Sequence, residues 1–323
     1  MVPTPDGTDP AQLEPSRSRM DSARGRRSAA TTSIRSAQAQ MENAAAATSP
    51  AANSTRAGHP QPVLDDIDAR PGSTTSLLRT TIGLYLRRLD GEISSAALVR
   101  LAGDLGILPA PARTAIARLK QKGLLLSRHG GYTLNPAATR MLERGDRRIF
   151  EVRRMQAGDP WCLISATIPE ARRDLRHQLR RRLQFIGAGS VAPGLWIVPG
   201  HLDDEVGQLL DELGAREFAT RFRAHDPRPA APLPEAVAGW WDLDALRAEH
   251  LRFHASVDAL PDEPFAAYVR LIDSWRVLPY VDPGLPAELL PTDWPGERSF
   301  AAFADLSVRL AGPAWEHVSA TAV

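Results

Sequence analysis

The segment Ile93–Leu134, ISSAALVRLAGDLGILPAPARTAIARLKQKGLLLSRHGGYTL, decides the fold of the first ordered part of the chain. Apolar residues at three- and four-residue spacing predict a short helix with one apolar face, which Ser94 or Ser95 can cap. These residues are Leu98, Leu101, Ala102 and Leu105. Gly106 ends this helix, and Ile107–Pro111 make a tight turn in which proline suits a first helical turn.

A second helix is predicted from about Ala110 to Lys122, followed by a hairpin with a turn at Gly130-Gly131. Its apolar side contains Ala112, Ala115, Ile116 and Leu119. The opposite face is polar or small and has no acidic residue. Helix, turn, basic helix and hairpin form the pattern of a winged helix-turn-helix, whose second helix enters the major groove of DNA.

The predicted DNA contacts lie on the second helix, on the hairpin and at the start of the first helix. They are Ser95, Arg113, Thr114, Ala117, Arg118, Lys120, Gln121, Lys122, Arg128, His129 and Tyr132. The alternative is an ordinary helical hairpin with a solvated basic face, since such faces are common. The hairpin is an independent element that favours DNA binding.

The charge of the chain is strongly polarised. The 323 residues have a net charge of +1, which excludes a uniformly basic protein. Residues 110–190 contain 17 Lys and Arg against 6 Asp and Glu, whereas residues 191–323 contain 10 against 21. A basic part followed by an acidic part indicates that one region alone meets a polyanion.

Cysteine usage and hydropathy predict a cytoplasmic protein without a membrane segment. The single cysteine, Cys162, permits no intramolecular disulfide, as is typical of a reducing compartment. It lies within the apolar run WCLISAT and is interpreted as a small buried residue. No apolar run approaches the ~20 residues of a membrane helix, and the N-terminus lacks the apolar core of a signal peptide.

The length and the pattern predict an α+β chain with several units. A disordered tail (1–72) precedes the winged helix-turn-helix (73–135). Thr74 or Thr75 can cap the supporting first helix of this unit. A linker helix (136–158) leads to a ferredoxin-like β-α-β-β-α-β domain (159–225). A proline-rich linker (226–238) and a helical C-terminal domain (239–318) follow. In that domain three helices are predicted: one that follows Trp240–Leu243 and runs to about Leu260, one over Pro264–Leu278 and one over Ser299–Ala311. A proline-rich extended segment separates the second helix from the third.

Three stretches in order resemble one family. They are RTAIARLKQKGLL at 113–125, PGLWIVP at 193–199, and DPGLPAELLPTDWPG at 282–296 preceded by WDL at 241–243. Together they are similar to the phenylacetic acid degradation repressor (PaaX) family of transcriptional regulators, over roughly residues 75–315. The resemblance implies a repressor of aromatic-acid catabolism that binds operator DNA as a homodimer. It also implies release by an aryl-CoA effector such as phenylacetyl-CoA, and a middle domain similar to the ferredoxin-like fold of CRISPR-associated nucleases.

Candidate effector residues gather in the C-terminal part: Arg270, Trp275, Arg276, Tyr280 and Trp294. The aromatic residues suit an aryl-acyl pocket and the arginines a phosphate or carboxylate, although the packed core of a helical domain and ordinary ion pairs are equally simple roles.

The sequence shows no catalytic cluster, no nucleotide-binding glycine motif and no cofactor signature, so we do not predict an enzyme. The first strand lacks the acidic residue that a metal-dependent nuclease needs. His250 and His254 stand four apart but lack the glutamate of an HExxH motif, so we predict no metal and interpret them as surface histidines. A nucleic-acid-binding regulator without an effector, with a middle domain that only dimerises, remains the alternative. An enzyme with an appended winged module is a third class.

Overall fold

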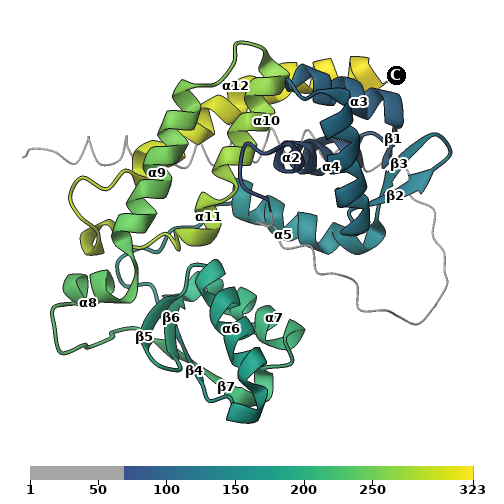
Figure 1. Ribbon diagram of the computed structural model, residues 1–323. Helices are drawn as coiled ribbons and strands as arrows, with labels where there is room; N and C mark the ends of the chain where they lie inside the picture. The colour runs from purple at the N-terminus through teal and green to yellow at the C-terminus, as the bar shows by residue number, and fades with distance from the viewer. Residues whose placement is uncertain (1–68, 323) are drawn as a thin grey trace, which may run out of the picture.

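The computed structural model describes residues 69–322 and has a mixed α+β architecture, as predicted (Figure 1). The predicted disordered tail lies, up to residue 68, outside the described residues. Elements from the two ends of the described chain form one body, and the middle of the chain forms a second body beside it (Figure 1).

The N-terminal unit combines three helices with a three-stranded antiparallel sheet of order β1-β3-β2. Its elements are α2 (Thr74–Tyr85), η1 (Leu86–Arg88), β1 (Glu92–Ser94), α3 (Ser95–Asp104), α4 (Pro109–Gln121), β2 (Leu125–Arg128) and β3 (Gly131–Leu134). The predicted cap of the first helix at Thr74 or Thr75 is wrong: the Ser73 side chain accepts from the Ser76 amide. Strand β1 was not predicted, because three residues are too few to show an alternating pattern.

The segment after β3 contains η2 (Pro136–Ala138) and α5 (Thr139–Phe150). The linker helix predicted over 136–158 is therefore too long. Beyond Phe150 the chain leaves the helix and runs beside the proline-rich segment, where the Met155 amide donates to the Gly284 carbonyl at 2.8 Å. That contact is tertiary and leaves no local signal in the sequence.

The middle unit has the predicted order of strands and helices. Its elements are β4 (Trp161–Ala166), η3 (Glu170–Arg172), α6 (Arg173–Phe185), β5 (Gly189–Ala192), β6 (Leu195–Pro199), η4 (Gly200–Leu202), α7 (Asp203–Glu212), η5 (Arg216–Phe218) and β7 (Ala219–Ala224). The four strands are antiparallel in the order β5-β6-β4-β7. Leucines of α6 and α7 pack with inward residues of the sheet, such as Ile164 and Val198, into one apolar cluster.

The C-terminal part is helical. Its elements are α8 (Leu233–Trp240), α9 (Leu243–Asp258), α10 (Pro264–Trp275), α11 (Leu278–Val281), η6 (Ala287–Leu289) and α12 (Gly296–Ala322). Helix α8 begins inside the predicted proline-rich linker. The helix tolerates Pro234 because this residue lies in the first turn, where no backbone amide is needed for a hydrogen bond. Helix α10 ends at Trp275, before the predicted Leu278. Helix α12 runs past the predicted Ala311 and contains Pro313.

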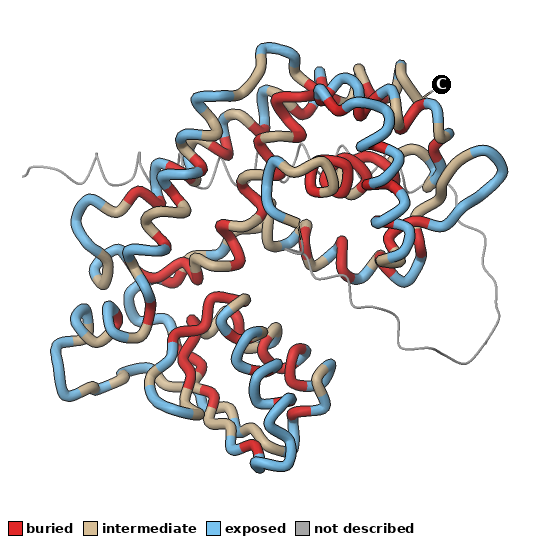
Figure 2. The backbone as a smooth tube through the Cα atoms, in the orientation of Figure 1, coloured by how far each residue is buried: buried red, intermediate tan, exposed pale blue. Residues whose placement is uncertain are grey.

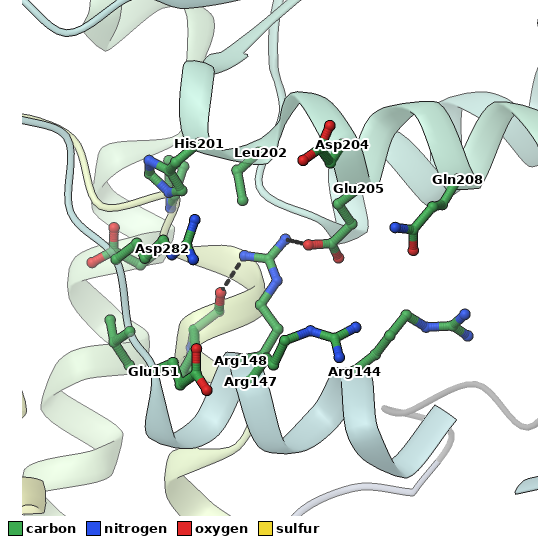
Figure 3. A pocket seen from close by; sticks show the side chains of 14 residues that line it. Arg144, Arg147, Arg148, Glu151, His201, Leu202, Asp204, Glu205, Gln208 and Asp282 are labelled. Carbon is green, nitrogen blue, oxygen red and sulfur yellow. Dashed lines mark hydrogen bonds and ion pairs between the residues drawn. The ribbon is translucent and has the colours of Figure 1, made fainter. Parts of the chain in front are cut away.

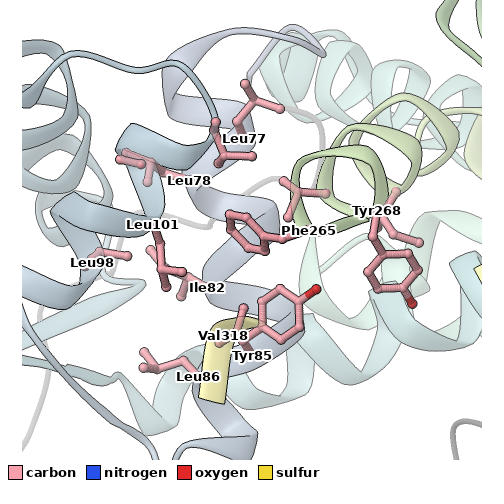
Figure 4. Packing of buried hydrophobic residues seen from close by; sticks show 14 of the residues in the cluster. Leu77, Leu78, Ile82, Tyr85, Leu86, Leu98, Leu101, Phe265, Tyr268 and Val318 are labelled. Carbon is pink, nitrogen blue, oxygen red and sulfur yellow. The ribbon is translucent and has the colours of Figure 1, made fainter. Parts of the chain in front are cut away.

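One apolar core joins the N-terminal unit to the C-terminal helices. Leu78, Ile82 and Tyr85 of α2 pack in one cluster with Phe265 of α10 and Val318 of α12 (Figure 4). The burial pattern follows this arrangement, since the surfaces where α2, α10 and α12 meet are buried while the turn between β2 and β3 is exposed (Figure 2). The N-terminal unit is therefore held by the opposite end of the described chain.

Candidate nucleic-acid interface

Helix α4 presents the polar face that the sequence predicted. Gly106 has a positive φ of 78°, which lets the chain turn between α3 and α4, and Pro109 occupies the first turn. The buried side consists of Ala112, Ala115, Ile116 and Leu119. The exposed side contains Arg113, Thr114, Ala117, Arg118, Lys120 and Gln121. The helix can therefore approach a partner through an acid-free surface.

One side-chain contact connects this face to the hairpin, and a second stays within the helix. Lys120 at the end of α4 donates from Nζ to Ser127 Oγ of β2 at 3.0 Å. Thr114 Oγ1 donates to the Ala110 carbonyl one turn back, at 3.1 Å, and so stays on the helix surface. Lys122 is half-buried at the C-terminus of the helix.

The hairpin lies against the start of α3. Ser94 caps α3, and the amide of the half-buried Ser95 donates to the Gly130 carbonyl at 3.1 Å. A Cβ at Gly131 would lie 2.3 Å from the Ile93 carbonyl oxygen, so the close pairing of β1 with β3 needs glycine there. The turn of the hairpin is thereby fixed beside the N-terminus of α3.

The predicted hairpin contacts are in different environments. His129 is exposed at the turn, whereas Tyr132 is half-buried and packs against the shared core. Arg128 is exposed and forms an ion pair with Glu92 of β1, with 3.1 Å between Nη1 and Oε1. Such an exposed pair contributes little and leaves the guanidinium accessible to a phosphate.

The five predicted effector residues lie in different surroundings. Arg270 donates to the Leu105 carbonyl at 2.9 Å, and Trp275 stacks on Phe303 with 4.4 Å between ring centroids. Arg276 and Tyr280 line a small cavity of about 50 Å³ beside α5. Trp294 lies farther along the chain, with its ring beside His250 and Arg247.

Arg276 belongs to a buried polar cluster between α2 and α10. Its Nε donates to Asp273 Oδ1 at 3.2 Å, and its Nη2 donates to Ser76 Oγ at 2.7 Å. Asp273 also accepts from Thr80 Oγ1 at 2.9 Å and from the Gly72 amide at 2.6 Å. These contacts join the N-terminal unit to the C-terminal helices.

The prediction that His250 lies on the surface is wrong. His250 is buried, with Nδ1 at 3.0 Å from Ser299 Oγ and Nε2 at 2.9 Å from Asp282 Oδ2. His254 Nε2 lies 3.0 Å from the same hydroxyl. Ser299 is fully buried, so the arrangement resembles a hydrolase triad in its contacts but offers no nucleophile to a substrate. Within residues 69–322 no group of three or more potential metal-ligating side chains occurs.

Cys162 is buried in β4, as predicted. Burial, followed by its hydrogen bond to Asp203, raises the pKa of the thiol to about 12, so the thiolate is not formed at neutral pH.

Arginines of α5 line a cavity against the middle unit. Arg144, Arg147 and Arg148 of α5 face η4 and α7 (Figure 3), and the following Arg153 also lines the cavity. The helical spacing of the arginines gives their common face, but the residues opposite them come from positions 201–208 and 279–283, which no local pattern reveals.

Comparison with known proteins identifies the family. Residues 73–138 match a model described as PaaX-like protein, residues 154–235 match the PaaX protein central Cas2-like domain, and residues 241–320 match the PaaX-like protein C-terminal domain. The transcriptional repressor PaaX of Escherichia coli (strain K12) is 27% identical over 271 residues, which cover 78% of this chain and 85% of that protein. Uncharacterized protein Rv0674 from Mycobacterium tuberculosis is similar in structure, with a TM-score of 0.54 and 25% identity. The match covers 77% of this chain and all of that one. In residues 69–322 no helix combines the length and the apolar character needed to cross a membrane.

Proposed function

Since the chain belongs to the PaaX family, we propose that it is a transcriptional repressor that binds operator DNA through a winged helix-turn-helix. The observation that carries this proposal is the acid-free exposed face of α4, which lies beside a hairpin with an exposed turn. The name of the Escherichia coli relative, transcriptional repressor PaaX, supports the same role.

Helix α4 is the proposed recognition helix. An α-helix fits the major groove, where arginine can contact guanine through two hydrogen bonds. Arg113 and Arg118 are the exposed arginines of α4, and the small side chain of Ala117 between them permits close approach of the backbone to DNA. Lys120 and Lys122 at the end of the helix suit phosphate contacts, which position a protein without reading bases.

The hairpin is the proposed wing. Arg128 and His129 lie at its exposed end, where a wing contacts the backbone or the minor groove. Because Ser95 is joined to this turn through its backbone amide, the wing and the start of α3 would meet DNA together.

A homodimer on a near-palindromic site follows from the small size of one recognition helix. The two half-site centres are then expected about one turn of DNA, ~34 Å, or a multiple of it apart. Residues 73–135 are the proposed DNA-binding unit, residues 159–225 the ferredoxin-like unit, and residues 239–318 the effector-responsive unit.

The proposed regulon is an aromatic-acid catabolic operon, and the proposed effector is an aryl-CoA such as phenylacetyl-CoA. An effector weakens operator binding only through a difference in affinity between two states of the repressor. The core shared by α2, α10 and α12 supports this switch, since a shift of the C-terminal helices changes the packing of the DNA-binding unit. We expect an aryl-CoA, and not the free acid, to weaken operator binding by ~5–150-fold.

Selection of bound sequences from random DNA, followed by affinity measurements, tests the DNA-binding role. The double variant Arg113→Ala with Arg118→Ala should lose ~1–3 kcal/mol of discrimination for each bidentate base contact removed. A matched control, Arg173→Ala with Arg180→Ala, removes two exposed arginines from α6 and should retain operator affinity. Equal affinity of the α4 variant and the control would show that α4 is not the recognition helix.

A further inference from the structure

A cavity of about 290 Å³ lies where α5, the segment from η4 to α7, and the chain around α11 meet (Figure 3). Its lining contains four arginines, more than any other residue type. The lining residues are Arg144, Arg147, Arg148, Glu151, Val152, Arg153, His201, Leu202, Asp204, Glu205, Gln208, Pro279, Asp282 and Pro283. The cavity therefore joins three parts of the chain that are distant in sequence.

Two of the arginines hold α5 against α7. Arg144 Nη1 lies 2.7 Å from Glu212 Oε1, and Arg148 Nη2 lies 2.8 Å from Glu205 Oε2. Arg148 also donates from Nη1 to the Pro279 carbonyl at 2.9 Å (Figure 3). These contacts fix the position of the Arg148 guanidinium at the wall of the cavity.

Donor groups remain for a ligand after these contacts are made. Arg148 Nε is buried and has no hydrogen-bond partner, although a buried donor is normally satisfied. Across residues 69–322 the side chains of Arg147 and Arg153 form no hydrogen bond or ion pair, and both are exposed at the rim. Three guanidinium groups around one cavity thus have unused donors.

The lining also contains four carboxylates, Glu151, Asp204, Glu205 and Asp282, so its formal charges balance, but two of these carboxylates are already engaged. Glu205 is paired with Arg148, and Asp282 accepts from the Gly284 amide at 2.8 Å and contacts the His250 ring. Asp204 is exposed at the edge.

His201 lies in the same lining, close enough to Arg148 and Arg153 to feel their charges. Burial, followed by the charges of Arg148 and Arg153, lowers the pKa of His201 to about 4. The imidazole is therefore neutral at physiological pH, because a further cation in this place is unfavourable.

We propose that this cavity binds the phosphate groups of a small organic phosphate, held by Arg147, Arg148 and Arg153. A tetrahedral phosphate accepts several hydrogen bonds, and guanidinium groups donate them in pairs. The volume is sufficient for a diphosphate together with part of its organic substituent. In the proposed repressor the ligand is the phosphate part of the CoA effector, and this identification rests on the proposed function. The proposal that the cavity binds phosphate does not depend on the proposed function.

Calorimetric titration of the full chain without DNA tests the site, with pyrophosphate, coenzyme A and phenylacetate as probes. Pyrophosphate and coenzyme A should bind, while phenylacetate, which has one carboxylate and no phosphate, should bind far more weakly. Arg147→Ala with Arg153→Ala should weaken phosphate binding about tenfold or more per arginine. The control Arg140→Ala with Arg180→Ala removes two other exposed arginines, one of them also on α5, and should change the Kd less than twofold.

The absence of binding by both phosphate probes, or equal binding by the cavity variant and the control, overturns the proposal. A second readout needs no variant: bound pyrophosphate should raise the pKa of His201, measured by NMR, from about 4 toward its ordinary value. An unchanged pKa at saturating pyrophosphate also overturns it. The operator affinity of the cavity variant, measured without phosphate, tests the proposed repressor separately.

Discussion

Removal of the Asp273 carboxylate should loosen the joint between the N-terminal unit and the C-terminal helices. Asp273 is 1% exposed and accepts from the Gly72 amide, Ser76 Oγ and Thr80 Oγ1, all on or next to α2. It also pairs with Arg276, whose guanidinium is nearly as buried. Asp273→Ala leaves that cation without its carboxylate, and loss of one partner of a buried ion pair costs about 3–5 kcal/mol.

Urea unfolding of the full chain, followed by circular dichroism, measures this loss. With a slope of about 3 kcal/mol per molar urea, the midpoint should fall by roughly 1–1.7 M. Asp305→Ala is the matched control, because Asp305 forms an exposed i,i+4 pair with Arg309 on α12 and should cost less than about 1 kcal/mol. If Asp273→Ala lowers the midpoint no more than Asp305→Ala does, the cluster does not hold the two parts together.

Three further predictions concern other parts of the molecule. The pKa of His201 is lowered from 6.5 to about 4, so the unfolded chain binds the proton at a higher pH than the folded chain does. The free energy of unfolding should therefore fall by up to about 3 kcal/mol as the pH drops from 6.5 to 4. His201→Gln should flatten that part of the stability profile, and an unchanged profile would contradict the assignment. Gly189→Ala should cost about 1–3 kcal/mol in thermal unfolding, because its Cβ would lie 2.7 Å from the Trp241 ring, whereas Gly103→Ala meets nothing within 4 Å and should cost nothing. Lys120→Ala should weaken DNA binding equally for all sequences and reduce its salt slope by about 1, and a sequence-dependent loss would instead assign Lys120 to base contact.

Local patterns were sufficient to predict most elements of the N-terminal and middle units, although not the three-residue strand β1. The spacing of Ala112, Ile116 and Leu119 predicted both the helix and its buried side, since each residue of an amphipathic helix reports its own environment. The turn at Gly130 was equally visible, because a positive φ of 79° at the hairpin favours glycine.

The contacts between the units could not be predicted from local patterns. Asp273 meets Thr80 across 193 positions of the chain, and no periodicity in either helix indicates the partner. The arginines of α5 had the spacing of a solvated face, and their cavity exists because α7 and the chain near Pro279 pack opposite them. Trp275 was a candidate for ligand contact, but it stacks on Phe303. The presence of an aromatic residue in the sequence does not reveal whether its ring packs in a core or contacts a ligand.

The core shared by the two ends of the described chain has a consequence for biosynthesis. Helix α10 begins at Pro264, about 130 residues after β3 ends at Leu134. At ~5–20 residues per second, a ribosome needs roughly 10 s to deliver it. Until then Leu78, Ile82 and Tyr85 of the nascent chain lack their partners on α10 and α12, and present an apolar surface suited to a chaperone. A chain that ends before α12 should therefore leave this apolar side of α2 without its C-terminal cover.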